Sequence, residues 1–141
     1  MFEKVQNNPN NILNKVEEEK VLLAEERMGL LIPDELRKFY LQVGCGKIYS
    51  LDNSINRLMG PLSCADIRLR EDVYEYDPDL EVYELYEDDK MIFFEINEGV
   101  YALIELSNNE HNKIYFADEL IADSLEEFLE KIEDSNYWNN C

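Results

Sequence analysis

The residues best suited to chemistry are the carboxylates of one short stretch, residues 71–89, which carries ten acidic side chains and no Lys or Arg. The acidic residues are Glu71, Asp72, Glu75, Asp77, Asp79, Glu81, Glu84, Glu87, Asp88 and Asp89. Four tyrosines lie among them, Tyr74, Tyr76, Tyr83 and Tyr86, and Pro78 interrupts the stretch. Because unpaired buried charges are very costly, we expect irregular structure or a short turn here, with the carboxylates in solvent.

Two kinds of ligand suit such a stretch. Asp77-Pro78-Asp79 and Asp88-Asp89 offer oxygen ligands for a divalent cation, but the EF-hand spacing is absent, so we expect no metal site. A basic protein is the better candidate, because tyrosines anchor interfaces and carboxylates steer the encounter. The residues expected to bind this partner are Asp72, Tyr74, Glu75, Tyr76, Asp77, Asp79, Glu81 and Tyr83. The competing interpretation is a solvated loop above half-buried tyrosines, since charge runs are usually solvated.

Catalytic patterns are not apparent. His111 is the single histidine and lies in a polar loop, SNNEHNK, while Cys45 sits between two glycines at an expected helix end. A cysteine–histidine pair would need Cys45 or Cys64 beside His111. The sequence has no dinucleotide fingerprint, P-loop or nucleophile elbow. We therefore expect neither an enzyme nor a bound cofactor.

Composition narrows the class of protein. The 141 residues suit one domain, 1–141, with residues 1–11 frayed. The net charge of −19 argues against binding nucleic acid or an anionic membrane, whereas it suits a basic protein partner or simple solubility.

Three cysteines without paired spacing indicate reduced thiols. With no apolar leader and no membrane-length apolar run, a cytoplasmic location is expected.

Helical periodicity is visible at both ends of the chain. Apolar spacing predicts a helix over Ile12–Met28, ended by Gly29. A second helix should begin at Pro33 and turn one face inward through Leu36, Phe39, Tyr40 and Val43. A third, short helix is expected after Pro61. Near the C-terminus, Ser124 and Glu127 form a capping box for a helix over Ser124–Asp134, and Tyr137 and Trp138 should fold back onto the body.

Strands are expected between these helices, at Lys47–Leu51, Met91–Ile96, Val100–Leu106 and Lys113–Ala117. Asn97-Glu98-Gly99 predicts a hairpin turn. The strands are apolar on both faces, which indicates cover by helices. The fold class is therefore α+β, a single domain with a central, mainly antiparallel sheet, two N-terminal helices and a C-terminal helix packed against it.

One segment resembles a known family. Residues 24–48, AEERMGLLIPDELRKFYLQVGCGKI, resemble the hallmark of the SUKH superfamily, also known as the Smi/Knr cell-wall-assembly-regulator family. The matching positions are Glu25, Gly29, Leu31, Ile32, Pro33, Phe39, Tyr40, Gly44 and Gly46. LMGPLSCADI (58–67) and YFADELIADSLEEFLEKI (115–132) agree, so the resemblance covers about Val16 to Ile132. Ile32-Pro33 replaces the usual Leu-Pro, and the acidic stretch is not part of the shared pattern.

The resemblance implies a small domain without an active site. Bacterial members are immunity proteins that bind a cognate toxin, often a nuclease, and fungal members regulate cell-wall synthesis and signalling. A compact chain of this kind is similar to the bacterial branch. Two alternatives stay open: a regulatory or scaffold protein of the Smi/Knr type, and an acidic nucleic-acid mimic that sequesters a basic protein. The oligomeric state is not predicted.

Overall fold

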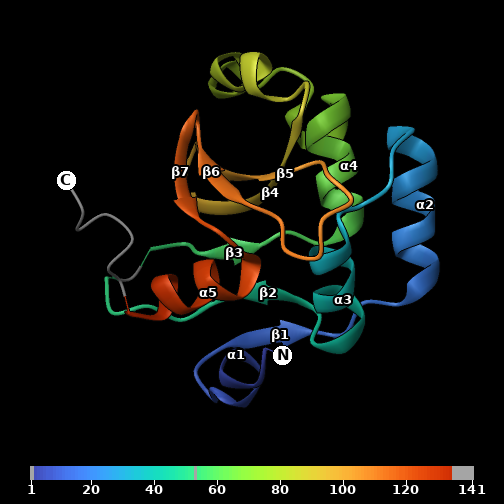
Figure 1. Ribbon diagram of the computed structural model, residues 1–141. Coiled ribbons are helices and arrows are strands. Elements are labelled where there is room, and N and C mark those ends of the chain that lie inside the picture. The colour runs from blue at the N-terminus through green and yellow to red at the C-terminus, as the bar shows by residue number, and fades with distance from the viewer. Residues whose placement is uncertain (1, 53, 135–141) are drawn as a thin grey trace.

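The computed structural model describes residues 2–52 and 54–134, and within them one sheet runs through the whole molecule (Figure 1). Seven strands pair antiparallel in chain order, each with the next. They are β1 (Ile12–Asn14), β2 (Cys45–Lys47), β3 (Arg57–Leu58), β4 (Lys90–Asn97), β5 (Val100–Glu105), β6 (Ile114–Phe116) and β7 (Glu119–Ala122). The longest pair, β4–β5, joins through the predicted turn at Gly99, whose φ of 74° suits glycine.

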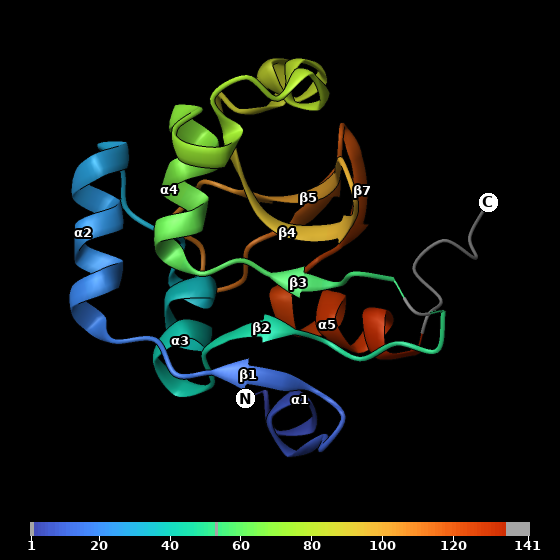
Figure 2. The ribbon, with the colours of Figure 1, turned by 180° about the vertical axis from the view of Figure 1, so that it is seen from behind.

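Helices pack around this antiparallel sheet, and the combination of the two confirms the α+β class. They are α1 (Glu3–Asn7), α2 (Glu18–Met28), α3 (Asp34–Gln42), α4 (Pro61–Leu69) and α5 (Leu125–Asp134), with two 3₁₀ helices, η1 (Asp72–Tyr74) and η2 (Pro78–Tyr86). Figure 2 shows the same arrangement from behind: α4 lies between α2 and the sheet, and α5 lies across the sheet on its other side. The helix α2 therefore packs along α4 rather than directly on the strands.

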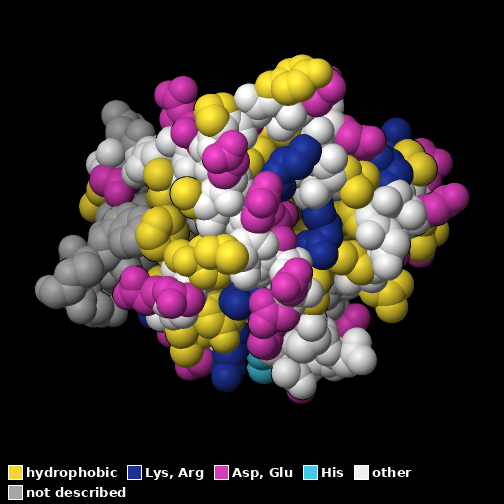
Figure 3. All heavy atoms as spheres, turned by 90° about the horizontal axis from the view of Figure 1, so that it is seen from above, with side chains coloured by type: hydrophobic (Ala, Val, Ile, Leu, Met, Phe, Trp, Pro, Cys, Tyr) yellow, Lys and Arg dark blue, Asp and Glu magenta, His cyan; other side chains and the backbone are white. Residues whose placement is uncertain are grey.

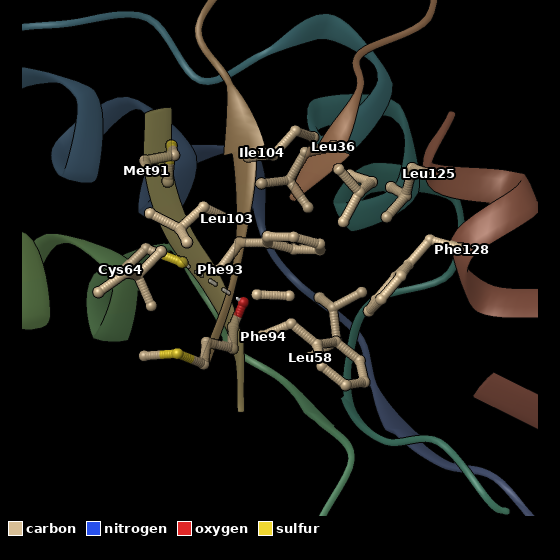
Figure 4. Close-up of a cluster of buried hydrophobic side chains, with 14 of the residues drawn as sticks. Leu36, Leu58, Cys64, Met91, Phe93, Phe94, Leu103, Ile104, Leu125 and Phe128 are labelled. Carbon is tan, nitrogen blue, oxygen red and sulfur yellow. Dashed lines mark hydrogen bonds between the residues drawn. The ribbon is translucent and has the colours of Figure 1, made fainter. Parts of the chain in front are cut away.

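The core forms where α3 and α5 meet β4 and β5. Leu36, Phe39 and Tyr40 of α3 are fully buried, as their helical spacing predicts. Figure 4 shows the ring of Phe128 from α5 directed toward Phe94 of β4, and their centroids lie 5.0 Å apart at 89°, an edge-to-face contact. The capping box is present in altered form: the Glu127 amide donates to Ser124 Oγ, while the Glu127 carboxylate accepts from the amide of Asp123 rather than from that of Ser124.

The N-terminal prediction was wrong in two respects. Residues 12–14 form strand β1, not the start of the helix, because Leu13 and its neighbours pair with β2, and α2 begins only at Glu18. Residues 3–7 form α1 rather than a frayed end. The ring of Phe2 stacks edge-on against Phe39 at 4.9 Å, and the Phe2 amide donates to Glu126 Oε2 at 2.9 Å. These contacts with distant residues have no signal in local periodicity.

One strand boundary also differs from the prediction. The strand expected at Lys47–Leu51 lies earlier, at Cys45–Lys47, where Gly44 and Gly46 let their backbones approach β1. A Cβ on Gly46 would lie 2.2 Å from the carbonyl oxygen of Ile12, so only glycine fits. Strands β3 and β7 were not predicted. The expected contacts of Tyr137 and Trp138 lie outside the described residues.

The family hallmark has a physical explanation in the α2–α3 connection. Gly29 ends α2 with a φ of 69°, the left-handed cap that its position predicts. The buried carboxylate of Glu25 reaches across the turn, accepts a hydrogen bond from the amide of Ile32 at 2.8 Å and pairs with Arg37 of α3. One glutamate of α2 thereby links that helix both to the connection and to α3.

A buried tyrosine–thiol contact leads to our first prediction, which concerns alkaline stability. Tyr40 Oη donates to the carbonyl of Met59 at 2.6 Å and lies 3.3 Å from Cys64 Sγ. Burial raises the pKa of the Cys64 thiol from its ordinary value near 9 to about 12. The unfolded thiol ionises first as pH rises, so its contribution to stability is present below about pH 9 and is lost toward pH 12.

We expect the free energy of unfolding to fall by roughly 2 kcal/mol between pH 8 and pH 11 through Cys64 alone. Urea unfolding at several pH values measures this slope. Cys64→Ala is the control: it is less stable at every pH because of the cavity, but it should show a shallower decline. Parallel declines in the two proteins would contradict the assignment.

Candidate functional site

The acidic stretch forms a separate layer at the top of the molecule in Figure 1, between the end of α4 and the start of β4. It is more ordered than the sequence indicates, since η2 is nine residues long. A 3₁₀ helix has three residues per turn, so residues at i, i+3 and i+6 share one face. Leu80, Tyr83 and Tyr86 form the face that turns inward, and Leu80 and Tyr83 are buried.

Tyr83 attaches η2 to the sheet. Its hydroxyl donates to the carbonyl of Gly99 at 3.2 Å and accepts from the amide of Tyr101 at 2.9 Å. The two tyrosine rings meet edge-on with centroids 5.5 Å apart. Burial raises the pKa of Tyr83, so the hydroxyl keeps its proton and its donor role.

Two arginines at the end of α4 hold the other side of the layer. Arg70 adopts the left-handed conformation at φ 54° and directs its guanidinium beneath η2. Its Nη2 donates to Glu87 Oε1 at 2.5 Å and to the carbonyl of Leu80 at 3.2 Å, and its Nη1 donates to the carbonyl of Ile67 at 2.6 Å. Arg68 donates to the carbonyls of Glu87 and Lys90. Neither arginine was predicted from the sequence to have this role.

The eight residues predicted to bind a partner divide into two groups. Five are exposed, namely Asp72, Glu75, Tyr76, Asp79 and Glu81. The other three have structural contacts. Tyr83 is buried, Tyr74 is half-buried and accepts from Arg57 at 3.3 Å, and Asp77 caps η2 by accepting from the amide of Asp79 at 3.0 Å. Of the eight, the five exposed side chains are thus the ones accessible to another protein.

The prediction from the sequence did not include the exposed apolar side chains of the acidic layer. Val73 of η1 and Val82 and Leu85 of η2 are exposed, as is Tyr76 in the turn between these helices. Their signal was the repeat of three residues through Asp79, Val82 and Leu85, a period shorter than the roughly 3.6 residues of an α-helix and longer than the two of a strand. Figure 3 shows this face from above. Yellow apolar groups alternate there with magenta carboxylates and dark blue cations, so the surface is not uniformly acidic.

A shallow groove of about 350 Å³ runs beside this surface. Its wall includes Tyr74, Tyr76, Glu81 and Glu84, and Arg70 is also part of the lining. The groove is polar and open, so it suits contact with a protein side chain better than enclosure of a small apolar ligand.

Cys45, Cys64 and His111 are the side chains that a cysteine–histidine pair would require. Burial raises the pKa of both Cys45 and Cys64, which keeps the thiols protonated and weakly nucleophilic. His111 is exposed, and its Nδ1 lies 3.7 Å from the Oε2 of buried Glu35. Across residues 2–52 and 54–134, no three His, Cys, Asp or Glu side chains are grouped to hold a metal ion. The same part of the chain contains no helix that is long and apolar enough to span a membrane.

Comparison with known proteins gives the family. Residues 15–131 match the model of the SMI1/KNR4 family (SUKH-1). The chain belongs to the SMI1/KNR4 family. It is also 40% identical over 134 residues to "Immunity protein YxxD" of Bacillus subtilis (strain 168), and the match covers 95% of this chain and 91% of that relative. No solved structure matches.

The SMI1/KNR4 match contains the α2–α3 hallmark and extends into α5, which confirms the resemblance. Helix α1 and strand β1 precede the matched range. Phe2, directly before α1, nevertheless packs on Phe39 of α3, and its amide bonds to Glu126 of α5. The acidic layer lies inside the matched range.

Proposed function

We propose that this protein is an immunity protein that binds a cognate toxin and blocks it by occupying its functional surface. The observation that carries the proposal is the 40% identity to a protein named as an immunity protein, because the similarity extends over nearly the whole of both chains. Protection by binding needs no catalytic group, which agrees with the protonated thiols and exposed histidine described above.

The charge supports a basic partner. The chain carries a net charge of −19, and the stretch 71–89 has carboxylates without a Lys or Arg of its own. A nuclease toxin has a basic cleft because it binds phosphates, and an acidic surface would be attracted to that cleft. The exposed residues Asp72, Glu75, Tyr76, Asp79 and Glu81 are the proposed contacts. The apolar groups between the carboxylates favour this interpretation over a pure nucleic-acid mimic.

The experiment tests whether this protein binds and inhibits the product of the gene next to its own. If it encodes a toxin, its C-terminal toxin domain should copurify with this protein and should lose its toxicity when both are produced in one cell. A toxin domain that neither binds this protein nor is inhibited by it would overturn the proposal.

Charge removal on the acidic layer gives a second prediction. The triple variant Glu75→Gln, Glu81→Gln, Glu84→Gln should lower the association rate with the toxin domain about tenfold at low ionic strength, because these exposed carboxylates steer the encounter. The difference should shrink between about 50 and about 300 mM NaCl as the charges become screened. Surface plasmon resonance measures both effects.

The control removes the same number of charges elsewhere. Glu18, Glu19 and Glu26 are exposed on α2, so their replacement by Gln gives the same net charge. This control should keep most of the association rate. Equal losses in the two triple variants would show that only the total charge matters and would contradict a role for the acidic layer.

A further inference from the structure

We propose that the exposed apolar side chains of η1, η2 and the turn between them are the anchor of the toxin interface, inserting into an apolar recess that Lys and Arg side chains border. This apolar ridge consists of Val73, Tyr76, Val82 and Leu85. The inference rests on the proposed function and deepens it, since it assigns the binding energy to apolar residues and the steering to the carboxylates around them.

The geometry of η2 separates the ridge from the core. Leu80, Tyr83 and Tyr86 occupy the inward row and attach the helix to the sheet. Val82 and Leu85 occupy another row, and 65% and 82% of their surfaces are exposed. The fold therefore does not use these two side chains. A second apolar row beside one that already supplies the core contacts is expected where another protein covers it.

Two further exposed side chains lie in η1 and in the turn between η1 and η2. Tyr76 is 87% exposed and Val73 is 77% exposed, although both residue types usually bury much of their surface. Tyr76 also lines the groove beside η2. Tyrosine is enriched among the residues that dominate binding energy, because its large ring is ordered at a low entropic cost.

The ridge is held in one conformation before it meets a partner. Arg70 bonds to both Leu80 and Glu87, so it ties the beginning of η2 to the residue that follows its end. Asp77 caps the first turn, and Tyr83 fixes the middle to Gly99 and Tyr101. A run of nine residues is long for a 3₁₀ helix, and these contacts maintain it. Preorganisation of this kind lowers the entropic cost of binding.

The surroundings of the ridge define the chemistry of its partner. Asp79 shares the row of Val82 and Leu85, and Glu81 and Glu84 form the adjacent row. All three carboxylates are exposed. An apolar centre with an acidic rim is complementary to an apolar recess with a basic rim. The same rim repels nucleic acid and anionic lipid, so the occupant is a basic protein.

The test replaces the ridge and leaves the charges in place. The double variant Val82→Ser, Leu85→Ser should raise the Kd for the toxin domain of the neighbouring gene at least about 100-fold, chiefly through faster dissociation. Tyr76→Ser should give a loss of about tenfold or more by itself. Because these side chains are exposed, circular dichroism and the urea midpoint should remain those of the unchanged protein.

Two exposed leucines provide matched controls. Leu31 is 73% exposed at the α2–α3 connection, and Leu51 is 76% exposed in the loop after β2. Leu31→Ser and Leu51→Ser should leave the Kd within about threefold, since surface contacts outside an interface contribute little to binding.

The outcomes separate the two proposals. A tight complex with the unchanged protein that survives Val82→Ser, Leu85→Ser would overturn the ridge while leaving the immunity function intact. A loss produced by Leu51→Ser instead would also overturn the ridge and would place the anchor on the loop at residues 51–60. Failure of the unchanged protein to bind the toxin domain would overturn the proposed function and the ridge together.

Discussion

Replacing Glu35 by alanine should destabilise the protein by about 4 kcal/mol, which would be the largest effect of a single polar substitution considered for this fold. The Glu35 side chain is fully buried in the first turn of α3. Its Oε1 accepts from the amides of Asn112 and Leu125 at 3.1 and 2.8 Å, and its Oε2 accepts from the amide of Glu126 at 3.2 Å. Truncation leaves these amides without their acceptor in the interior, including two at the start of α5.

Two further variants test this explanation. Glu35→Gln keeps the volume and one acceptor oxygen but places an NH₂ group against an amide donor, so it should cost about half as much. Asp34→Ala is the control, because Asp34 lies in the same helical turn but is exposed, and its loss should cost less than about 1 kcal/mol. Urea unfolding monitored by circular dichroism gives all three values. A Glu35→Ala protein as stable as Asp34→Ala would show that the carboxylate is dispensable.

Replacing Arg70 by alanine should have the second largest effect, and a different kind of effect. The guanidinium holds Glu87, Leu80 and Ile67 together beneath η2, and Glu87 is its partner in a bidentate ion pair. Its removal leaves the largely buried Glu87 carboxylate without this partner, so we expect a loss of about 3 kcal/mol. Because the sheet does not depend on Arg70, the loosening should be concentrated in residues 71–89.

Hydrogen exchange measured by mass spectrometry distinguishes local from global loosening. In Arg70→Ala, peptides from 71–89 should exchange at least about tenfold faster, while peptides from β4 and β5 keep most of their protection. Arg70→Lys should rescue only part of the effect, since an ammonium cannot form the bidentate pair. Uniform acceleration over the whole chain would contradict a local role. The variant should also bind the toxin domain more weakly, because the ridge would no longer be preorganised.

Local patterns in the sequence predicted those elements whose side chains repeat with a regular period. The face of α3 through Leu36, Phe39 and Tyr40, the capping of α5 by Ser124 and the hairpin at Gly99 all follow from spacing or turn chemistry. Strands β1, β3 and β7 were missed because two to four residues are too few to show alternation. Helix α1 exists because Phe2 reaches Phe39 and Glu126, and such distant contacts leave no mark on the neighbouring residues.

The sequence predicted the charge of the candidate site but not its conformation. The carboxylates of 71–89 were evident from composition, and because buried charges are costly the stretch was expected to be irregular. The period of three residues in η2 matches neither an α-helix nor a strand, so it gave no signal of order. The buried position of Tyr83 depends on Gly99 and Tyr101 of the β4–β5 hairpin, and the order of η2 depends on Arg70 at the end of α4. Exposed and buried tyrosines could therefore not be separated before these elements were placed together.

The order of the strands has a consequence for synthesis on the ribosome. Each strand pairs with the one before it, so the sheet can grow as the chain emerges, and η2 has its main supports once β5 is complete at Glu105. The Phe2 amide, however, bonds to Glu126, 124 positions further along the chain. The acidic layer should thus be formed co-translationally, whereas the two ends of the domain close on each other only after α5 has left the exit tunnel.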